Sequence, residues 1–259
     1  MPLPCVPDAS AQKTPSKSGH AYELADYTPA TSPMVPALVV YCINEIESRG
    51  LGEVGLYRIP GSEREVRDLK EKFLAGRGCP NLHHLDVHTL TGVVKDFLRS
   101  LRQPLIPTYM WHIFTQAASN PDMTDGESEL YQAISELPQP NRDTLAFVML
   151  HLQKVSIFPV TKMSVSNLAR ILGPTIVGYS SPDSPHEAML KEVGAQSSTM
   201  EKLINVDNEY WRTFINVDEA EPLYPDDNRI ISNTPECIFR TPIVKMPRMS
   251  MRLGAKVGA

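Results

Sequence analysis

The chain has 259 residues, a formal net charge of -5, and 42% hydrophobic and 21% charged residues, a composition ordinary for a soluble globular protein. This length allows one substantial core flanked by tails, and the charge gives no reason to expect nucleic acid as a partner. No apolar run reaches the roughly 18 to 20 residues of a membrane span, and the N-terminus lacks the layout of a signal peptide. The four cysteines form no Cys-x-x-Cys pair, which argues against a disulfide framework and indicates reduced thiols in a cytosolic or nuclear setting.

The two ends of the chain differ from its centre in composition. Residues 1–31 carry scattered prolines among Ser, Thr and Ala, which predicts a Pro/Ser/Thr-rich linker. Residues 218–259 are also proline-rich, and from Ile238 onward they contain five Lys or Arg residues and no acid. This pattern predicts a flexible basic tail. Its Thr-Pro dipeptides fit proline-directed kinases, although such dipeptides are also common by chance.

Between the tails, hydrophobic periodicity predicts a series of helices. The first spans 33–49 with Ser32 as its N-cap, and a capping box at Ser62 and Glu65 opens the second. Gly173-Pro174 should stop a later helix, and Asp207 should cap the last one. The remaining helices are expected at 90–101, 109–118, 127–137, 141–155, 163–172, 198–204 and 209–217. Because no strands alternate with these helices, we expect an all-α fold with one domain over residues 32–217.

Arg58 lies in the segment Gly55-Leu56-Tyr57-Arg58-Ile59, between the first two expected helices. Leu56 and Tyr57 can anchor this loop to a core, so the guanidinium should point outward. Two interpretations stay open at this point. Arg58 is either an ordinary surface or salt-bridge arginine, or a residue that acts on something outside its own core.

Lys95, Arg99 and Arg102 recur at i, i+4 and i+7, on the side of their expected helix away from the apolar stripe. Aligned cations repel one another mildly, and a purely structural face would more often interleave acids. The cations therefore form either a solvated helix face or a docking surface for an acidic partner or phosphates.

Asn167 precedes Leu168-Ala169 in a short expected helix, where Ala or Glu would be easier to accommodate. Its amide offers both a donor and an acceptor for orienting a partner. The other interpretation, which the residues alone favour, is an internal cap or a buried hydrogen bond.

Several other motifs fail. The chain has no GxxxxGK[ST] loop and no GxSxG elbow. Leu190 stands where a metalloprotease pattern beginning at His186-Glu187 needs its second histidine. His84 and His88 have the spacing of a zinc pair but lack a third ligand nearby. We therefore expect neither a metal site nor a bound cofactor.

Three blocks together carry a family resemblance: Gly55–Arg58, Val94–Arg99 with Gln103–Pro107, and Asn167–Pro174. With them the chain resembles the domain of Rho-family GTPase-activating proteins, over roughly residues 32–217. The separations of 37, 4 and 68 residues between Arg58, Lys95, Arg99 and Asn167 also fit that family.

The resemblance implies roles for these residues. Arg58 matches the arginine finger, which enters the partner's nucleotide pocket and neutralises charge on the transferred phosphoryl group. Lys95 and Arg99 match a pair that supports the finger loop and contacts the GTPase, and Asn167 matches a residue that helps to orient the docked switch region. GTP and Mg²⁺ belong to the partner, whose own glutamine positions the attacking water. The chain would then have no hydrolase activity of its own.

Further segments, among them Thr31–Pro36 and Asn141–Phe147, resemble the branch of this family that supplies the GTPase-activating subunit of centralspindlin. This resemblance implies a role in cytokinesis. It also implies a location in the cytoplasm and cytoskeleton at the spindle midzone, or in the nucleus during interphase. The expected partner is a kinesin-containing complex, bound through regions outside this chain. Pro60 departs from the small polar residue of many relatives and stiffens the loop. The alternative function is a non-catalytic docking or scaffold module that uses the same helical face.

Overall fold

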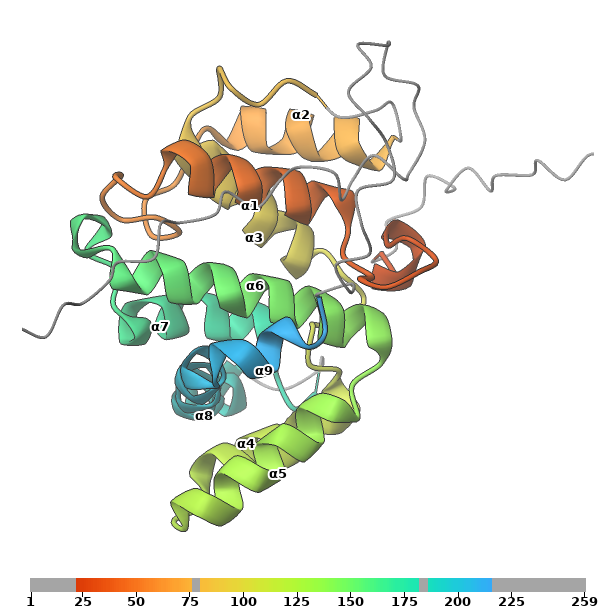
Figure 1. Cartoon of the computed structure of the whole chain (residues 1–259), viewed down its shortest axis with the longest axis vertical. Coiled ribbons are helices and arrows are strands. Elements are labelled where there is room, and N and C mark those ends of the chain that lie inside the picture. Colours follow the sequence, from red (N-terminus) through yellow and green to blue (C-terminus); the bar gives the residue numbers. More distant parts are fainter. Residues whose placement is uncertain (1–21, 76–79, 182–185, 216–259) are drawn as a thin grey trace, which may run out of the picture.

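The computed structural model describes residues 22–75, 80–181 and 186–215 (Figure 1). Within these ranges the regular elements are helices, and the β-structure there is limited to an isolated bridge between Tyr22 and Leu101. The expectation of an all-α fold is therefore confirmed. None of the helices in the described ranges combines the length and the apolarity needed to cross a bilayer.

The domain has two ends joined by a long central helix (Figure 1). At one end, α1 (Ala37–Arg49) and α2 (Glu63–Leu74) both pack against α3 (Val87–Arg99). At the other end, α4 (Trp111–Ser119) and α5 (Met123–Ser135) form an antiparallel pair that projects away from the rest. Helix α6 (Gln139–Ile157) crosses the middle and contacts α7 (Val165–Ile176), α8 (His186–Asn205) and α9 (Asn208–Arg212). Three short 3₁₀ helices, η1 (Leu24–Tyr27), η2 (Thr108–Met110) and η3 (Pro159–Thr161), complete the described elements.

Helix α6 is buried on most of its surface, as its apolar sequence predicted. Leu145, Met149, Leu152 and Val155 are each fully buried in the core that α6 shares with its neighbours. Burial of such side chains is the main favourable term in folding, and it fixes α6 as the scaffold on which the loops at the α1–α3 end rest.

Two of the expected caps are confirmed. The Ser62 side chain accepts a hydrogen bond from the amide of Glu65 at the start of α2, at 3.4 Å. At the start of α9, the Asp207 carboxylate accepts from the amide of Glu209, at 2.9 Å. Both caps satisfy amides that have no partner inside their helix.

The first helix starts later than predicted. Helix α1 begins at Ala37, and Ser32 does not cap it. Instead, the hydroxyl of Ser32 and the amide of Met34 both donate to the buried carboxylate of Asp143 on α6, at 3.0 and 2.9 Å. This tertiary anchor ties the chain before α1 to α6.

Helix α7 also differs from the prediction, because it continues through Gly173-Pro174 to Ile176. A Cβ at Gly173 would lie 3.2 Å from the carbonyl oxygen of Gln196, so the glycine allows α8 to approach α7 closely. We attribute the tolerance of Pro174 to this packing, which outweighs the loss of one backbone hydrogen bond in the last turn. Helix α8 is likewise longer than the predicted 198–204 segment and begins at His186.

The linker predicted at residues 1–31 is shorter than expected, since residues from Tyr22 onward pack on the domain. The amide of Tyr22 donates to the carbonyl of Ser100, and its carbonyl accepts from the amide of Arg102, at 3.2 and 2.7 Å. Leu24 is buried, and Tyr27 meets Phe97 edge to face. Periodicity could not reveal this segment, because one buried leucine and two tyrosines form no repeating pattern. Residues 1–21 and the predicted basic tail at 218–259 lie outside the described residues.

Candidate functional site

The loop between α1 and α2 folds back on itself around Gly55. Gly55 has a φ of +76°, which a glycine adopts without steric cost. Its carbonyl accepts hydrogen bonds from the amides of Arg58 and Ile59, both at 2.9 Å, and its amide donates to the carbonyl of Thr161, at 2.7 Å. The loop is therefore a tight turn that is tied to the end of η3.

Tyr57 also has a left-handed backbone, with a φ of +67°. This conformation is rare for a bulky side chain, and such residues concentrate at functional sites. Leu56 and Tyr57 are buried, with 0% and 1% of their surface exposed, and they hold the strained turn in place. The burial of both side chains was predicted from the sequence, but the backbone conformation was not.

Arg58 follows these two anchors and is exposed, as predicted. Among the described residues its guanidinium forms no ion pair and donates no hydrogen bond. The salt-bridge interpretation of Arg58 is therefore not supported. Val54 and Ile59 of the same loop are also partly exposed, with 38% and 39% of their surfaces accessible.

Lys95 lies on α3 beneath the loop. Its Nζ donates to the carbonyl oxygen of Tyr57, at 2.5 Å. Burial, together with the nearby charge of Arg99, lowers the pKa of the Lys95 ammonium. A half-buried cation is thus fixed on the peptide group that joins Tyr57 to Arg58, so Lys95 supports the arginine directly.

Arg99 is placed differently. It is exposed, and it donates to the carboxylate of Asp96 over 2.9 Å, while Lys70 of α2 donates to the second oxygen of Asp96. Burial raises the pKa of Asp96, but the hydrogen bonds and charges of Lys70 and Arg99 outweigh burial and leave this pKa lowered. Within the described residues, Arg99 therefore borders the site and forms no hydrogen bond or ion pair with the loop that carries Arg58.

The cations Lys95, Arg99 and Arg102, expected to align on one face of a helix, are arranged differently in two respects. Asp96 pairs with Arg99 at the i, i+3 spacing, so one of the cations has an acidic neighbour on its own helix. Arg102 lies beyond the end of α3 and pairs with Glu23, at 2.9 Å. Arg102 therefore does not belong to the same helix face as Lys95.

Asn167 lies in the first turn of α7. Its amide donates to the hydroxyl of Ser164, which caps the helix, and its side-chain Nδ2 donates to the carbonyl of Lys162, at 3.3 and 3.4 Å. Lys162 has a φ of +53° and follows Thr161, the residue that accepts from Gly55. Asn167 therefore supports the turn on which the Arg58 loop rests, and sequence reasoning missed Thr161 and Lys162 because no motif marks that turn.

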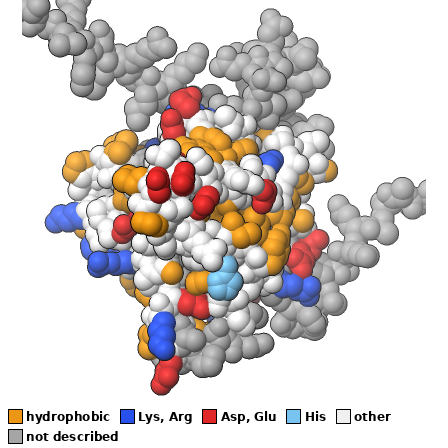
Figure 2. Space-filling model, turned by 90° about the horizontal axis from the view of Figure 1, so that it is seen from below, with side chains coloured by type: hydrophobic (Ala, Val, Ile, Leu, Met, Phe, Trp, Pro, Cys, Tyr) orange, Lys and Arg blue, Asp and Glu red, His pale blue; other side chains and the backbone are white. Residues whose placement is uncertain are grey.

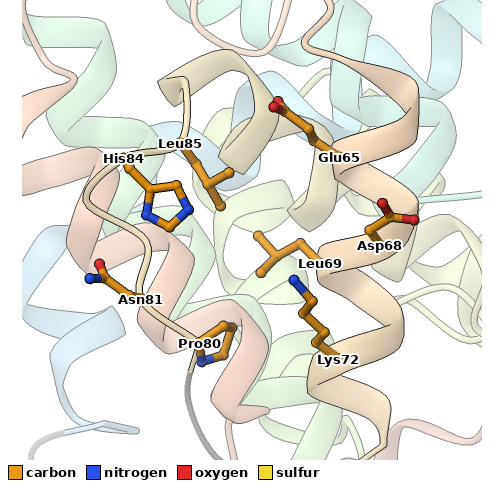
Figure 3. Close-up of a pocket in the computed structure, with 8 residues that line it drawn as sticks. All are labelled: Glu65, Asp68, Leu69, Lys72, Pro80, Asn81, His84 and Leu85. Atoms are coloured by element: carbon orange, nitrogen blue, oxygen red, sulfur yellow. The ribbon is translucent and has the colours of Figure 1, made fainter.

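A shallow pocket lies elsewhere, between α2 and residues 80–85 (Figure 3). Its wall combines acidic, basic and apolar side chains, among them Glu65, Lys72 and Leu69, and the ring of His84 borders it. The described residues contain no group of three side chains suited to a metal ion. None of Arg58, Lys95, Arg99 and Asn167 lines this pocket.

Comparison with known proteins agrees with this geometry. A family model described as the RhoGAP domain matches residues 36–181. The chain is 47% identical over 219 residues to mouse Rac GTPase-activating protein 1, which covers 84% of this chain and 34% of that protein. It is 34% identical over 176 residues to the probable Rho-GTPase-activating protein 7 of Schizosaccharomyces pombe, covering 66% of this chain and 24% of the relative. The chain thus spans about a third or less of the length of these curated relatives.

Solved structures give the same result. The BH domain of GRAF, the GTPase regulator associated with focal adhesion kinase, matches with a TM-score of 0.61 and 28% identity over 70% of this chain and 96% of that domain. Human Rho GTPase activating protein 15 matches with a TM-score of 0.60 and 28% identity, over 66% of this chain and 81% of that structure. The chain belongs to the RhoGAP domain family.

Proposed function

We propose that this chain accelerates GTP hydrolysis by a Rho-family GTPase and that Arg58 is its arginine finger. The observation that carries the proposal is an exposed arginine, without an ion-pair partner among the described residues, directly after a buried tyrosine with a left-handed backbone. A loop of this kind presents a guanidinium at a fixed place and leaves it free to pair with phosphate oxygens.

The expected contribution of Arg58 is large. Charge develops on the transferred phosphoryl group, and a finger that neutralises it raises the rate by roughly 10³ to 10⁵, or about 4 to 7 kcal/mol of transition-state stabilisation. GTP and Mg²⁺ are held by the partner in this proposal, so the chain itself needs neither a base nor a cofactor.

The other candidate residues take supporting roles. Lys95 holds the carbonyl of Tyr57 and so limits the positions that Arg58 can adopt. Arg99 is exposed one helical turn away, where it can contact an acidic surface of the docked GTPase. Asn167 braces the turn at Lys162 and presents its amide beside that turn, where it can orient the docked switch region.

The relative named Rac GTPase-activating protein 1 makes Rac a natural first substrate to test beside Rho and Cdc42. From the resemblance carried by segments such as Thr31–Pro36 and Asn141–Phe147, we also propose a role in cytokinesis at the spindle midzone, within a kinesin-containing centralspindlin complex. Contacts with that complex would come from regions outside this chain, because the chain corresponds to only 34% of the mouse relative.

Single-turnover hydrolysis tests the proposal directly. Purified Rho, Rac and Cdc42 are each loaded with GTP, and phosphate release is followed with and without the domain at increasing concentration. We expect at least one GTPase to hydrolyse GTP faster, with a rate that saturates. Saturable binding to these GTPases without any acceleration would contradict the proposal and support the non-catalytic docking module instead.

A further inference from the structure

A polar cluster that includes two buried rings lies beneath the loop that carries Arg58. It consists of Tyr57 from the loop, Glu47 from α1, and His151 and Lys154 from α6. The rings of Tyr57 and His151 meet edge to face, with their centroids 5.7 Å apart. Tyr57 is 1% exposed and the side chain of His151 is 0% exposed, so the loop rests on a histidine inside the domain.

Two polar atoms on these touching rings lack a hydrogen-bond partner. The hydroxyl oxygen of Tyr57 and the Nε2 of His151 are both buried and both unpaired among the described residues. Buried polar groups are almost always paired, because an unmade hydrogen bond costs the full desolvation of each group. Finding two such atoms on adjacent rings therefore indicates a contact that this arrangement of the loop leaves unmade.

The remaining contacts of His151 make its Nε2 a suitable partner for the hydroxyl. Its Nδ1 lies 3.0 Å from a carboxylate oxygen of Glu47, and Lys154 donates to the other oxygen. Burial raises the pKa of Glu47, but the hydrogen bonds and charges of His151 and Lys154 outweigh burial and leave the pKa lowered, so Glu47 is ionised at neutral pH. Because a carboxylate only accepts, Nδ1 carries a proton. The Tyr57 hydroxyl can both donate and accept, so it can pair with Nε2 whether or not Nε2 carries a proton.

We propose that His151 is a positioning residue for Arg58, acting through a hydrogen bond between its Nε2 and the Tyr57 hydroxyl that forms when the loop engages a GTPase. The inference rests on the proposed function. Tyr57 and Arg58 share a peptide group whose carbonyl is held by Lys95, so a shift of the tyrosine ring toward His151 re-aims the arginine. A bond made only in the engaged complex stabilises the transition state without tightening ground-state binding.

The substitution Tyr57→Phe removes the hydroxyl and little else. In the free domain that hydroxyl has no partner, so we expect the melting temperature to stay the same or to rise. At saturating domain, the rate of GTP hydrolysis should fall by about threefold to tenfold, the range for one net hydrogen bond. Affinity for the GTPase loaded with a non-hydrolysable GTP analogue should not change.

Tyr210→Phe is the matched control. The hydroxyl of Tyr210 does have a partner, since it donates to the carbonyl of Tyr131 at 3.0 Å, away from the Arg58 loop. This variant should lower the melting temperature and leave the saturating rate unchanged. The opposite effects of the two substitutions on stability and rate separate positioning from a merely structural role.

Combination with Arg58→Ala completes the test. If His151 and Tyr57 act through Arg58, Tyr57→Phe and His151→Leu should each lower the rate in the parent domain and cause no further loss in the Arg58→Ala background. An equal fold loss in both backgrounds, or a full rate for Tyr57→Phe when Arg58→Ala is inactive, would overturn this inference alone. A full rate for Arg58→Ala itself would instead overturn the proposed function, and with it the role of His151.

Discussion

The two ends of the domain are built in different ways. At the α1–α3 end, Tyr57 and Lys162 have left-handed backbones, and the loop contacts are polar: an ammonium on a carbonyl, and an amide on a neighbouring turn. At the α4–α5 end, no described residue of the two helices has a positive φ, and α5 opens with an ordinary cap from Asp122. Backbone strain at residues other than glycine is costly, and its concentration at one end agrees with our proposal that this end, called the working end below, contacts the GTPase.

The two ends of the domain also differ in their charged residues. Residues 111–135, which include α4 and α5, contain four acids and no Lys or Arg. Figure 2 views the molecule from this side, and acidic and apolar side chains occupy the middle of that face while basic side chains lie toward its edges. The candidate cations Arg58, Lys95 and Arg99 all belong to the opposite end. A GTPase contacted through phosphate oxygens and acidic side chains should therefore dock at the α1–α3 end.

The largest expected effect comes from removing Arg58. Arg58→Ala should lower stimulated GTP hydrolysis at least about a hundredfold and leave the melting temperature and ground-state binding nearly unchanged, because the finger acts mainly in the transition state. Arg212→Ala, on α9, removes another exposed arginine and should keep the full rate. If the Arg58 variant stimulates hydrolysis to a near-normal rate in single-turnover assays, Arg58 is not the arginine finger.

A pair of glycines tests whether backbone strain matters only at the working end. An alanine at position 55 would have to adopt a φ of +76°, and its Cβ would lie 2.9 Å from the Ile59 side chain. Gly55→Ala should therefore distort the loop and lower the free energy of unfolding by about 1 to 2 kcal/mol. A Cβ at Gly126 would meet the carbonyl oxygen of Ala117 at 2.9 Å, which should separate α5 from α4 at a similar cost of about 1 to 3 kcal/mol.

Both glycine variants should therefore lower the denaturation midpoint, but only Gly55→Ala should also lower the saturating hydrolysis rate, by roughly tenfold, because only it displaces Arg58. Denaturation by urea and single-turnover hydrolysis, measured on the same samples, distinguish the two. A rate loss in Gly126→Ala as large as that in Gly55→Ala would show that general destabilisation explains both.

Sequence periodicity predicted the helices well because each buries a regular stripe or, for α6, most of its surface. It also placed Arg58 in an exposed loop after two buried anchors. The boundaries were less predictable. Ser32 bonds to Asp143, which is 111 positions away in the sequence, and α7 continues past Pro174 because α8 packs on it. Both outcomes depend on tertiary contacts that no local pattern records.

The candidate site was predictable as a set of residues but not as an arrangement. A left-handed backbone is expected at Gly55, yet nothing in the sequence indicates that Tyr57 shares it. Lys95 and Arg99 looked equivalent on a helical wheel, whereas one contacts the loop and the other an acid that also binds α2. Long-range pairs of this kind arise from packing, so only the structure separates their roles.

Lys95 and Arg99 should accordingly differ in the size of their effects. Lys95→Met keeps most of the aliphatic stem but loses the donor to Tyr57, and we expect about a tenfold loss in rate together with weaker binding of a transition-state mimic. Arg99→Ala should cost about threefold, and the effect should shrink at high salt because the side chain is 72% exposed. If either variant binds the transition-state mimic with undiminished affinity, that residue is part of a solvated helix face and not of the docking surface.

The smallest expected effect is on the stability of the domain at acidic pH. The lowered pKa of Glu47, whose ordinary value is 4.5, means that its ionised form is favoured in the folded state. A group whose pKa is lower in the folded state than in the unfolded state stabilises the fold at pH values above its unfolded pKa. This contribution is lost as the pH falls through the pKa of the folded state. The domain should therefore lose stability below about pH 4.5, in part because the contacts of Glu47 with His151 and Lys154 weaken. Glu47→Gln should be less stable at pH 7 and should flatten this part of the acid dependence. Melting temperatures measured between pH 7 and pH 3.5 test this, and an acid profile of Glu47→Gln that parallels the parent would show that the cluster beneath Tyr57 does not stabilise the working end.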